Sequence, residues 1–247
     1  MKRLVFLLLG LLLATNSLQA FEPSRMHPSD RFFVTLFTDA WQNVPDEMDL
    51  STIQRGINVS AMQDMPMGRS NFSIAAGLEF SSHNLYSDHR YLLYPDHSLS
   101  QEEKYDFAPL RRDYDKNKLS LNYLEVPVQF RYRTRGLNRT FRIYAGMKAG
   151  YLVNAHTKYE GKDNYLLQDG IHLYEELEDL LSDTYTREIK TKEHRLGNLA
   201  DYRIGLTAMV GYGSLNLHLY YPLTKIFEDN SASDMYPVSV GVSLILF

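Results

Sequence analysis

The stretch that decides the fold is Tyr236–Phe247, "YPVSVGVSLILF". Large apolar residues take every second position from Tyr236 to Leu246, and the positions between them hold mainly Pro, Gly and Ser. Successive side chains of a β-strand point to opposite faces, so a period of two residues is typical of a strand. The stretch therefore predicts a strand with one apolar face and one face of small residues.

Seven other stretches repeat this alternation. In each one, aromatic and aliphatic residues alternate with small or charged residues over a strand's length. The first half of the earliest stretch is apolar on both faces, which leaves its register open. The seven stretches cover residues 31–41, 55–65, 71–82, 123–134, 140–154, 201–212 and 214–222.

The polar face of these stretches separates two classes of β-protein. A soluble barrel or sandwich would turn its apolar residues inward and expose lysine and glutamate. Here the polar face is rich in Gly, Ala and Ser mixed with charges of both signs, which suits a crowded, narrow interior. The apolar face is long, aromatic and uncharged, as a surface in contact with lipid must be. The pattern favours a membrane barrel over a soluble periplasmic β-domain.

The connections between the stretches alternate in length. Short ones are "PMGR", "RGLNR" and "GYG". Outer-membrane barrels have short periplasmic turns and long extracellular loops. We therefore expect an all-β, eight-stranded antiparallel up-and-down transmembrane barrel with both termini in the periplasm. The expected long loops are residues 44–53, 86–118, 156–198 and 223–235.

Composition and the first residues narrow the class further. Lys2 and Arg3 precede the apolar run Leu4–Leu13, and Ala20 follows as a small residue, so residues 1–20 are predicted to be a signal peptide. Residues 21–247 are then one barrel domain. The chain has no cysteine for disulfides, and its net charge of −4 argues against nucleic-acid binding. It has 18 Tyr, a residue that suits membrane–water boundaries.

The last strand should also close the barrel. In lipid, unpaired backbone groups have no partner, so the last strand is expected to pair with the first. Tyr236, Val240 and Phe247 are the residues expected to be read by the barrel insertion machinery. By the alternation, Phe247 falls on the same face as Gly241 and Ser243. The terminal aromatic of such strands usually falls on the other face, with the outward apolar residues.

Three of these stretches carry a family resemblance. "NYLEVPVQFRYR", "YAGMKAGYLVN" and "YPVSVGVSLILF" resemble the PorT-like outer-membrane β-barrel proteins of Bacteroidota, most specifically over Tyr123–Val153. The resemblance implies an eight-stranded barrel in the outer membrane of a Gram-negative bacterium. It also implies, for a few members, a link to secretion machinery.

Charged residues at the inward-facing positions of the strands predict a network of ion pairs in the barrel lumen. Buried charges must be paired, so an interior set of ion pairs is expected, either as a filling or as a gated or proton-conducting path. An eight-stranded interior is only wide enough for side chains, which favours the filling. The residues concerned are Asp39, Glu79, Glu125, Arg131, Arg133, Arg142, Lys148, Asp201 and Arg203.

The residue types allow two other chemistries, a metal site and a hydrolase. Histidines and aspartates outside the expected strands could hold zinc or nickel, but their spacing fits no ligand motif, so no metal and no cofactor is predicted. An embedded hydrolase built from Ser214, His218 and Asp201 is the alternative of another class. The residues considered for the metal were His83, Asp88, His89, Asp96, His97, His156, His172 and His194.

The longest loop, residues 156–198, contains a helical pattern. Leu173, Leu177, Leu180 and Leu181 recur at helical spacing. The helix could cap the barrel mouth or dock a protein partner. We expect a non-catalytic scaffold that contacts outer-membrane lipid and presents loops to a partner. The alternatives are a component of a secretion or transport assembly, a small channel or the hydrolase.

Overall fold

The computed structural model describes ten parts of the chain. They are residues 30–46, 48–68, 70–91, 107–109, 114–134, 140–164, 186–193, 196, 199–227 and 234–246. The expected signal peptide, Phe247 and the leucines of the expected loop helix all lie outside these parts. Within them, no helix is long and apolar enough to cross a membrane.

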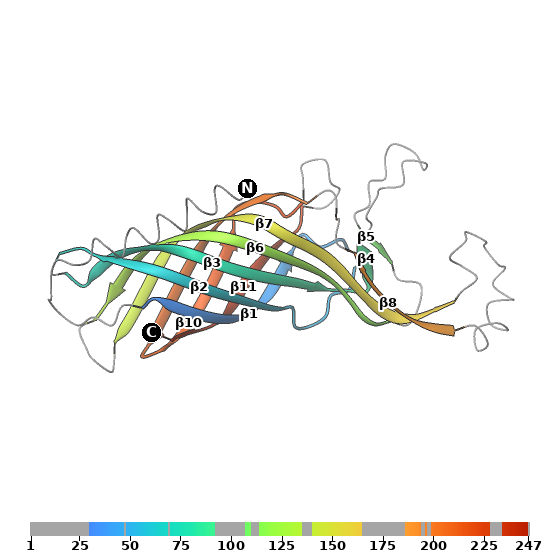
Figure 1. Ribbon diagram of the computed structural model, residues 1–247, viewed down its shortest axis with the longest axis horizontal. Helices are drawn as coiled ribbons and strands as arrows, with labels where there is room; N and C mark the ends of the chain where they lie inside the picture. Colours follow the sequence, from blue (N-terminus) through green and yellow to red (C-terminus); the bar gives the residue numbers. More distant parts are fainter. Residues whose placement is uncertain are drawn as a thin grey trace.

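Eight strands form a closed antiparallel ring (Figure 1). Each strand pairs with its neighbours in chain order, and the pairing of β6 with β7 completes the circuit. The ring contains no unpaired edge, which confirms the predicted eight-stranded barrel. Its members are β1 (Phe32–Gln42), β2 (Arg55–Pro66), β3 (Phe72–Tyr86), β6 (Tyr114–Arg133), β7 (Phe141–Asn164), β9 (Tyr202–Tyr212), β10 (Leu215–Pro222) and β11 (Tyr236–Ile245).

The last strand pairs with the first, as the terminal pattern predicts. Phe33 lies opposite Ile245, and the register continues without a break to Gln42 opposite Tyr236. Val240 lies on the outer face, as expected. The alternation in Tyr236–Leu246 therefore reflects a strand that faces lipid on one side and the lumen on the other.

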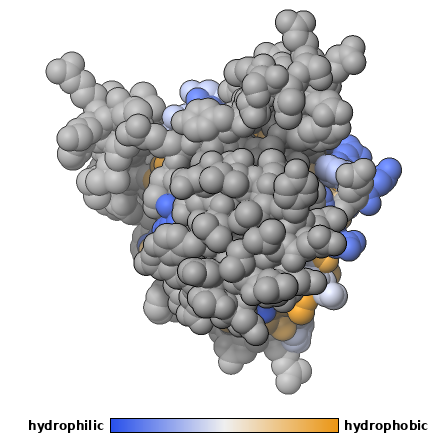
Figure 2. Space-filling view, turned by 90° about the vertical axis from the view of Figure 1, so that its right-hand side faces the viewer, coloured by the Kyte–Doolittle hydropathy of each residue, from blue (hydrophilic) through white to orange (hydrophobic). Residues whose placement is uncertain are grey.

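The distribution of apolar and polar side chains is the reverse of that in a soluble barrel. Its outward apolar side chains are mostly 40–60% exposed, whereas polar and charged side chains fill the interior. Such an exposed apolar surface is stable only against lipid. Examples of the outer face from six strands are Leu36, Val59, Phe80, Val128, Leu206 and Val242. The view along the long axis shows hydrophobic as well as hydrophilic residues on the flank (Figure 2).

The two ends of the ring differ. We call the end with the short connections β2–β3, β6–β7 and β9–β10 the turn end, and the opposite end the loop end. At the turn end, Gly68 and Gly213 have φ of 61° and 65°, which a side chain disfavours. Tyr212 pairs with Leu215 across the two-residue β9–β10 turn. This geometry explains glycine at both turns.

Three further strands correct the predicted loops at the loop end. β4 (His89–Tyr91) pairs with β5 (Phe107–Pro109) as a separate small sheet within the expected loop 86–118. β7 continues to Asn164 and pairs there with β8 (Thr186–Glu193). Much of the expected loop 156–198 is therefore a hairpin that extends the wall beyond the ring, as Figure 1 shows.

A bulge in β7 reverses its faces above the ring. Asn122 lies opposite Asn154, but Tyr123 lies opposite Leu152, so Val153 is the extra residue. Before the bulge the odd-numbered residues of β7 point outward; after it Ala155 and Thr157 are buried, and the even-numbered residues point outward. This reversal places Ala155 and Thr157 on the inner side of the extension.

An apolar cluster closes the lumen at the loop end. The strands contribute its wall, and the connections after β1, β8 and β10 contribute the rest. Leu199 and Phe227 form an isolated bridge that holds two of these connections together. The buried members are Trp41, Met48, Leu85, Leu119, Leu121, Tyr123, Ala155, Leu199, Ile226, Phe227 and Met235.

Candidate functional site

The predicted lumen charges lie in two clusters inside the barrel. Eight of the nine are inward and at most 6% exposed: Asp39, Glu79, Glu125, Arg131, Arg133, Arg142, Lys148 and Arg203. Asp201 is the exception and a correction, because it precedes β9 and its side chain is exposed. Its backbone carbonyl accepts a hydrogen bond from the Leu152 amide at 2.7 Å.

The cluster nearer the loop end is organised around two carboxylates that lie opposite each other in register. Glu79 pairs with Glu125 across β3 and β6. Lys148 Nζ on β7 donates to both, at 2.7 Å to Glu79 Oε1 and 2.8 Å to Glu125 Oε2. Arg203 Nε on β9 donates to Glu125 Oε1 at 2.8 Å. Two cations thus hold together two anions that would otherwise repel.

The same cluster continues through a histidine to the first and last strands. Arg203 Nη2 donates to Ser81 Oγ at 3.0 Å, and Ser81 Oγ lies 2.9 Å from His83 Nε2. His83 Nδ1 lies 2.8 Å from Asp39 Oδ2, and Ser239 Oγ donates to Asp39 Oδ1 at 2.6 Å. With the carboxylate ionised, His83 donates from Nδ1 and accepts the Ser81 hydroxyl at Nε2. The loop-end cluster therefore ties β1 and β11 to β3, β6, β7 and β9.

The second cluster lies at the turn end and is built on Asp30, just before β1. Arg142 Nε donates to Asp30 Oδ2 at 2.9 Å, and the Tyr144 hydroxyl donates to the same carboxylate. Arg133 bridges Asp30 to Asp64 of β2. The chain thus enters the lumen before its first strand and is held there by charge.

Arg131 completes the turn-end cluster. It donates to the Asp30 carbonyl at 3.0 Å and twice to Gln129 Oε1, at 3.0 and 2.9 Å. Its guanidinium lies over the rings of Tyr144 and Phe33, at 4.7 and 5.2 Å from their centroids. These contacts satisfy an arginine that is wholly buried.

Sequence reasoning missed Asp30, Asp64 and His83 as members of the network. Asp64 has the inward parity of β2, so the pattern alone could have included it. The sequence pattern places His83 outside the strands, but β3 continues to Tyr86 and buries it in the lumen. Asp30 precedes the alternating stretch, and no local signal places it inside.

One wall of the lumen is less fully paired. Asn216, His218 and Tyr220 are consecutive inward residues of β10, and each has a buried polar atom without a partner among the described residues. His218 Nε2 makes a long hydrogen bond with Thr207 Oγ1, at 3.4 Å. A buried polar atom of this kind is usually met by ordered water.

The hydrolase constellation considered from sequence is not assembled. Ser214 lies in the turn after β9, and Asp201 precedes the opposite end of that strand, so the two are at opposite ends of the barrel. Ser81, His83 and Asp39 do have the hydrogen-bond order of a catalytic triad. The Ser81 oxygen, however, is wholly buried and already accepts from Arg203. This hydroxyl links charged groups rather than facing a substrate.

The histidines considered for a metal separate in the structure. His83 is in the lumen, and His89 Nδ1 lies 2.7 Å from Asp88 Oδ1 at the loop end. His156 is on the outer face of β7. In the described ranges no three His, Cys, Asp or Glu residues gather as metal ligands. Asp96, His97, His172 and His194 lie outside those ranges.

The comparisons with known proteins agree with this architecture. The family model described as outer membrane protein beta-barrel domain matches residues 33–228, from β1 to the connection after β10. No curated protein and no solved structure matches the chain. The closed ring, its exposed apolar belt and this match identify an integral outer-membrane barrel. The chain belongs to the outer membrane protein beta-barrel domain family.

Proposed function

We propose that this barrel is a non-conducting, non-catalytic scaffold that presents its loop end to a partner outside the cell. The observation that carries the proposal is the filled lumen. Two buried charge clusters occupy it, and the apolar cluster around Trp41 and Leu121 covers its loop end. An eight-stranded barrel filled in this way leaves its outer surfaces and loops for recognition.

The orientation of the loop end is part of the proposal. Short turns in the periplasm and long loops outside are the rule for such barrels. The chain contains no cysteine, so one introduced thiol reports its own side of the membrane. Lys192 is exposed on β8 at the loop end, and Ser214 is exposed in a connection at the turn end, so Lys192→Cys and Ser214→Cys are the two variants to label. A membrane-impermeant maleimide added to intact cells should label the first and not the second; the reverse pattern contradicts the orientation.

The hairpin formed by β7 and β8 is the proposed docking element. It extends beyond the ring, and a loop on a rigid scaffold is where binding residues usually lie. Replacing residues 161–194 with a short Gly-Ser linker removes all of β8 and the end of β7 from Gly161 onward. It leaves every β7–β9 pair in place and removes only the terminal Tyr114–Gly161 pair between β6 and β7. We expect a folded barrel that no longer retains its partner.

A second deletion sharpens this experiment. Replacing only residues 166–184 leaves the paired strands of the hairpin and removes what they connect. Partners are identified by crosslinking in native outer membranes followed by co-purification. Loss of the partner in both deletions assigns binding to residues 166–184, and loss in the longer deletion alone assigns it to the hairpin strands. Full retention in both contradicts the proposal.

The alternative is a subunit of a secretion or transport assembly, which the resemblance of Tyr123–Val153 to PorT-like proteins supports. The same crosslinking separates the two roles by the partner: periplasmic or inner-membrane secretion components favour the assembly. A conducting role predicts large, stable single-channel steps in planar bilayers. The scaffold predicts a silent bilayer.

A further inference from the structure

Three lysines stand in one row across the wall of the loop-end extension. Lys118 of β6 lies directly opposite Lys158 of β7, and Lys158 lies directly opposite Lys192 of β8. Directly opposite residues of antiparallel strands share a face, with Cβ atoms about 5 Å apart. Lys116 is two residues from Lys118 and therefore shares this face. We call Lys116, Lys118, Lys158 and Lys192 the lysine row.

The lysine row faces outward. Its neighbours on β6, Asn117 and Leu119, are buried, whereas Lys116 is exposed and Lys118 is partly exposed. On β7, the bulge at Val153 turns Lys158 to the same side. Without this extra residue, Lys158 would point to the inner side and Thr157 would replace it in the row.

Like charges directly opposite each other on a sheet are destabilising. Lys118 Nζ donates to Asn84 Oδ1 at 3.0 Å and lies 5.8 Å from the centroid of the Tyr86 ring, and neither group carries a negative charge. Glu160 Oε2 lies 3.6 Å from Lys158 Nζ, and Glu160 lies directly opposite Lys116, so this one carboxylate offsets part of the charge of the four lysines. Burial lowers the pKa of Lys118, and the charges of Lys116, Lys158 and Lys192 lower it further. An anion bound to the row would relieve this repulsion.

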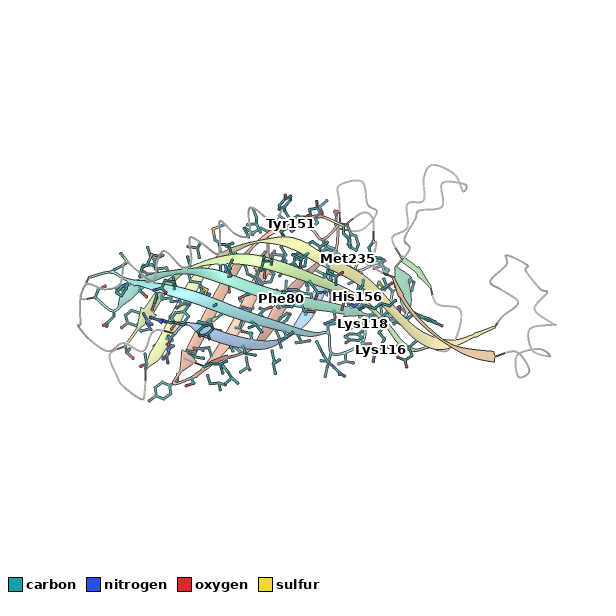
Figure 3. All side chains as sticks on the ribbon, viewed as in Figure 1. Phe80, Lys116, Lys118, Tyr151, His156 and Met235 are labelled. Atoms are coloured by element: carbon teal, nitrogen blue, oxygen red, sulfur yellow. The ribbon has the colours of Figure 1, made fainter. Side chains whose placement is uncertain are left out.

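The height of the lysine row above the lipid indicates which kind of anion it binds. Phe80, Leu124 and Tyr151 lie opposite one another in register and form an outward apolar row on β3, β6 and β7, beyond which β7 adds only the exposed Val153. Lys118 lies six residues beyond Leu124, about 20 Å along the strand and about 15 Å above the apolar boundary at the usual tilt. Figure 3 shows Lys118 and Lys116 lying progressively farther from Phe80 toward the loop end.

A phospholipid headgroup layer is too thin to reach this level, because the polar region adds only about 5–8 Å on each side of the hydrocarbon core. The sugars of the outer-leaflet lipopolysaccharide do extend to this height, and they carry phosphate groups. We propose that the lysine row binds phosphate groups on the saccharide of outer-leaflet lipopolysaccharide. This inference rests on the proposed orientation, with the loop end outside.

The test is binding of purified lipopolysaccharide to the detergent-solubilised full chain, followed by native mass spectrometry. Wild type should bind lipopolysaccharide, bind its enzymatically dephosphorylated form at least ten times more weakly, and bind phosphatidylglycerol and inorganic phosphate no better than the dephosphorylated form. Equal binding of the dephosphorylated form overturns the proposal. Equal binding of phosphatidylglycerol or free phosphate overturns the saccharide as its source.

Two variants assign the binding to the row. Lys118→Gln, Lys158→Gln and Lys192→Gln together should weaken binding at least tenfold and keep the heat-dependent gel mobility of a folded barrel, since relief of the mutual repulsion offsets the loss of the Lys118–Asn84 and Lys158–Glu160 contacts. Lys158→Glu places an anion between two cations in register, and it should also abolish binding while leaving the barrel at least as resistant to unfolding. Unchanged binding in either variant overturns the assignment.

The matched control is Lys225→Gln. Lys225 is also an exposed lysine at the loop end, but it lies 2.5 Å from Asp234 and away from the row. Binding should be unchanged in this variant, and an equal loss there would show nonspecific charge attraction and overturn the site. Maleimide labelling of Lys192→Cys tests the orientation separately. If that label shows the lysine row outside the cell and lipopolysaccharide still fails to bind, the result contradicts the binding proposal and not the orientation.

Discussion

Lys148 provides the sharpest test of how the lumen is held together. Its side chain is 1% exposed, and its ammonium bridges Glu79 and Glu125, which face each other across β3 and β6. Lys148→Met keeps an unbranched side chain of similar length and removes both charge-assisted hydrogen bonds. Glu79 then loses its ion-pair partner, and Glu125 retains Arg203.

Removing one partner of a buried ion pair costs about 3–5 kcal/mol, because the remaining charge stays buried without compensation. The unfolding equilibrium constant should therefore rise by roughly 100-fold to several thousand-fold. The second substitution Glu79→Gln removes the uncompensated carboxylate. The double variant Lys148→Met/Glu79→Gln should therefore recover part of the loss.

The assay is reversible urea unfolding in lipid vesicles, followed by the fluorescence of the single tryptophan. Trp41 is 8% exposed and lies in the apolar cluster at the loop end, so its emission reports whether the barrel is closed. Lys225→Met is the control for replacing an exposed lysine. If Lys148→Met lies within about 1 kcal/mol of wild type, or if Glu79→Gln adds to the loss, the charge network is not what stabilises the lumen.

The remaining predictions concern the lipid face, the packing of the lumen and closure of the ring. Leu206→Arg places a charge on the outer face of β9, where Leu206 is 45% exposed, and should cost about 2–4 kcal/mol near the bilayer midplane; assembly at the wild-type level refutes the assigned face. Gly205→Ala directs a methyl group at the Tyr220 ring and should cost about 1–3 kcal/mol in the same urea titration, whereas no change would show a looser lumen. The closed ring should migrate differently on gels before and after boiling in sodium dodecyl sulfate, and identical mobilities would contradict closure.

Much of the fold was predictable because its signals are local. The inside–outside alternation of Phe72–Phe80 or Tyr202–Val210 depends only on the pleat of the strand and on which solvent each face meets. The alternation of short and long connections then predicted that strands adjacent in sequence are neighbours in the ring. The expected loop 156–198 was wrong in part, because the hairpin strands Lys158–Asn164 and Thr186–Glu193 are polar on the outer side and lie beyond the lipid, where apolar periodicity ends.

The candidate sites were harder to predict, because they depend on partners distant in sequence. The alternation placed Lys148 and Glu125 on the inner face, but only the register of the three strands β3, β6 and β7 shows that Lys148 reaches both Glu79 and Glu125. Asp201 has the same parity as Arg203, yet it lies one residue outside the strand and turns to solvent.

The sequence by itself determined that this chain alternates between two solvents, that it does so eight times, and that its last strand must meet its first. The physical reason is local: a strand places neighbouring residues on opposite faces, and lipid tolerates only one kind of face. Tertiary structure alone decided which charges meet. Asp30 enters the lumen ahead of β1, His83 joins Ser81 to Asp39, and the extra residue Val153 brings Lys158 into line with Lys118 and Lys192. These outcomes depend on the register shift between each pair of strands and on the position of bulges around the closed ring. No single stretch of sequence contains this information.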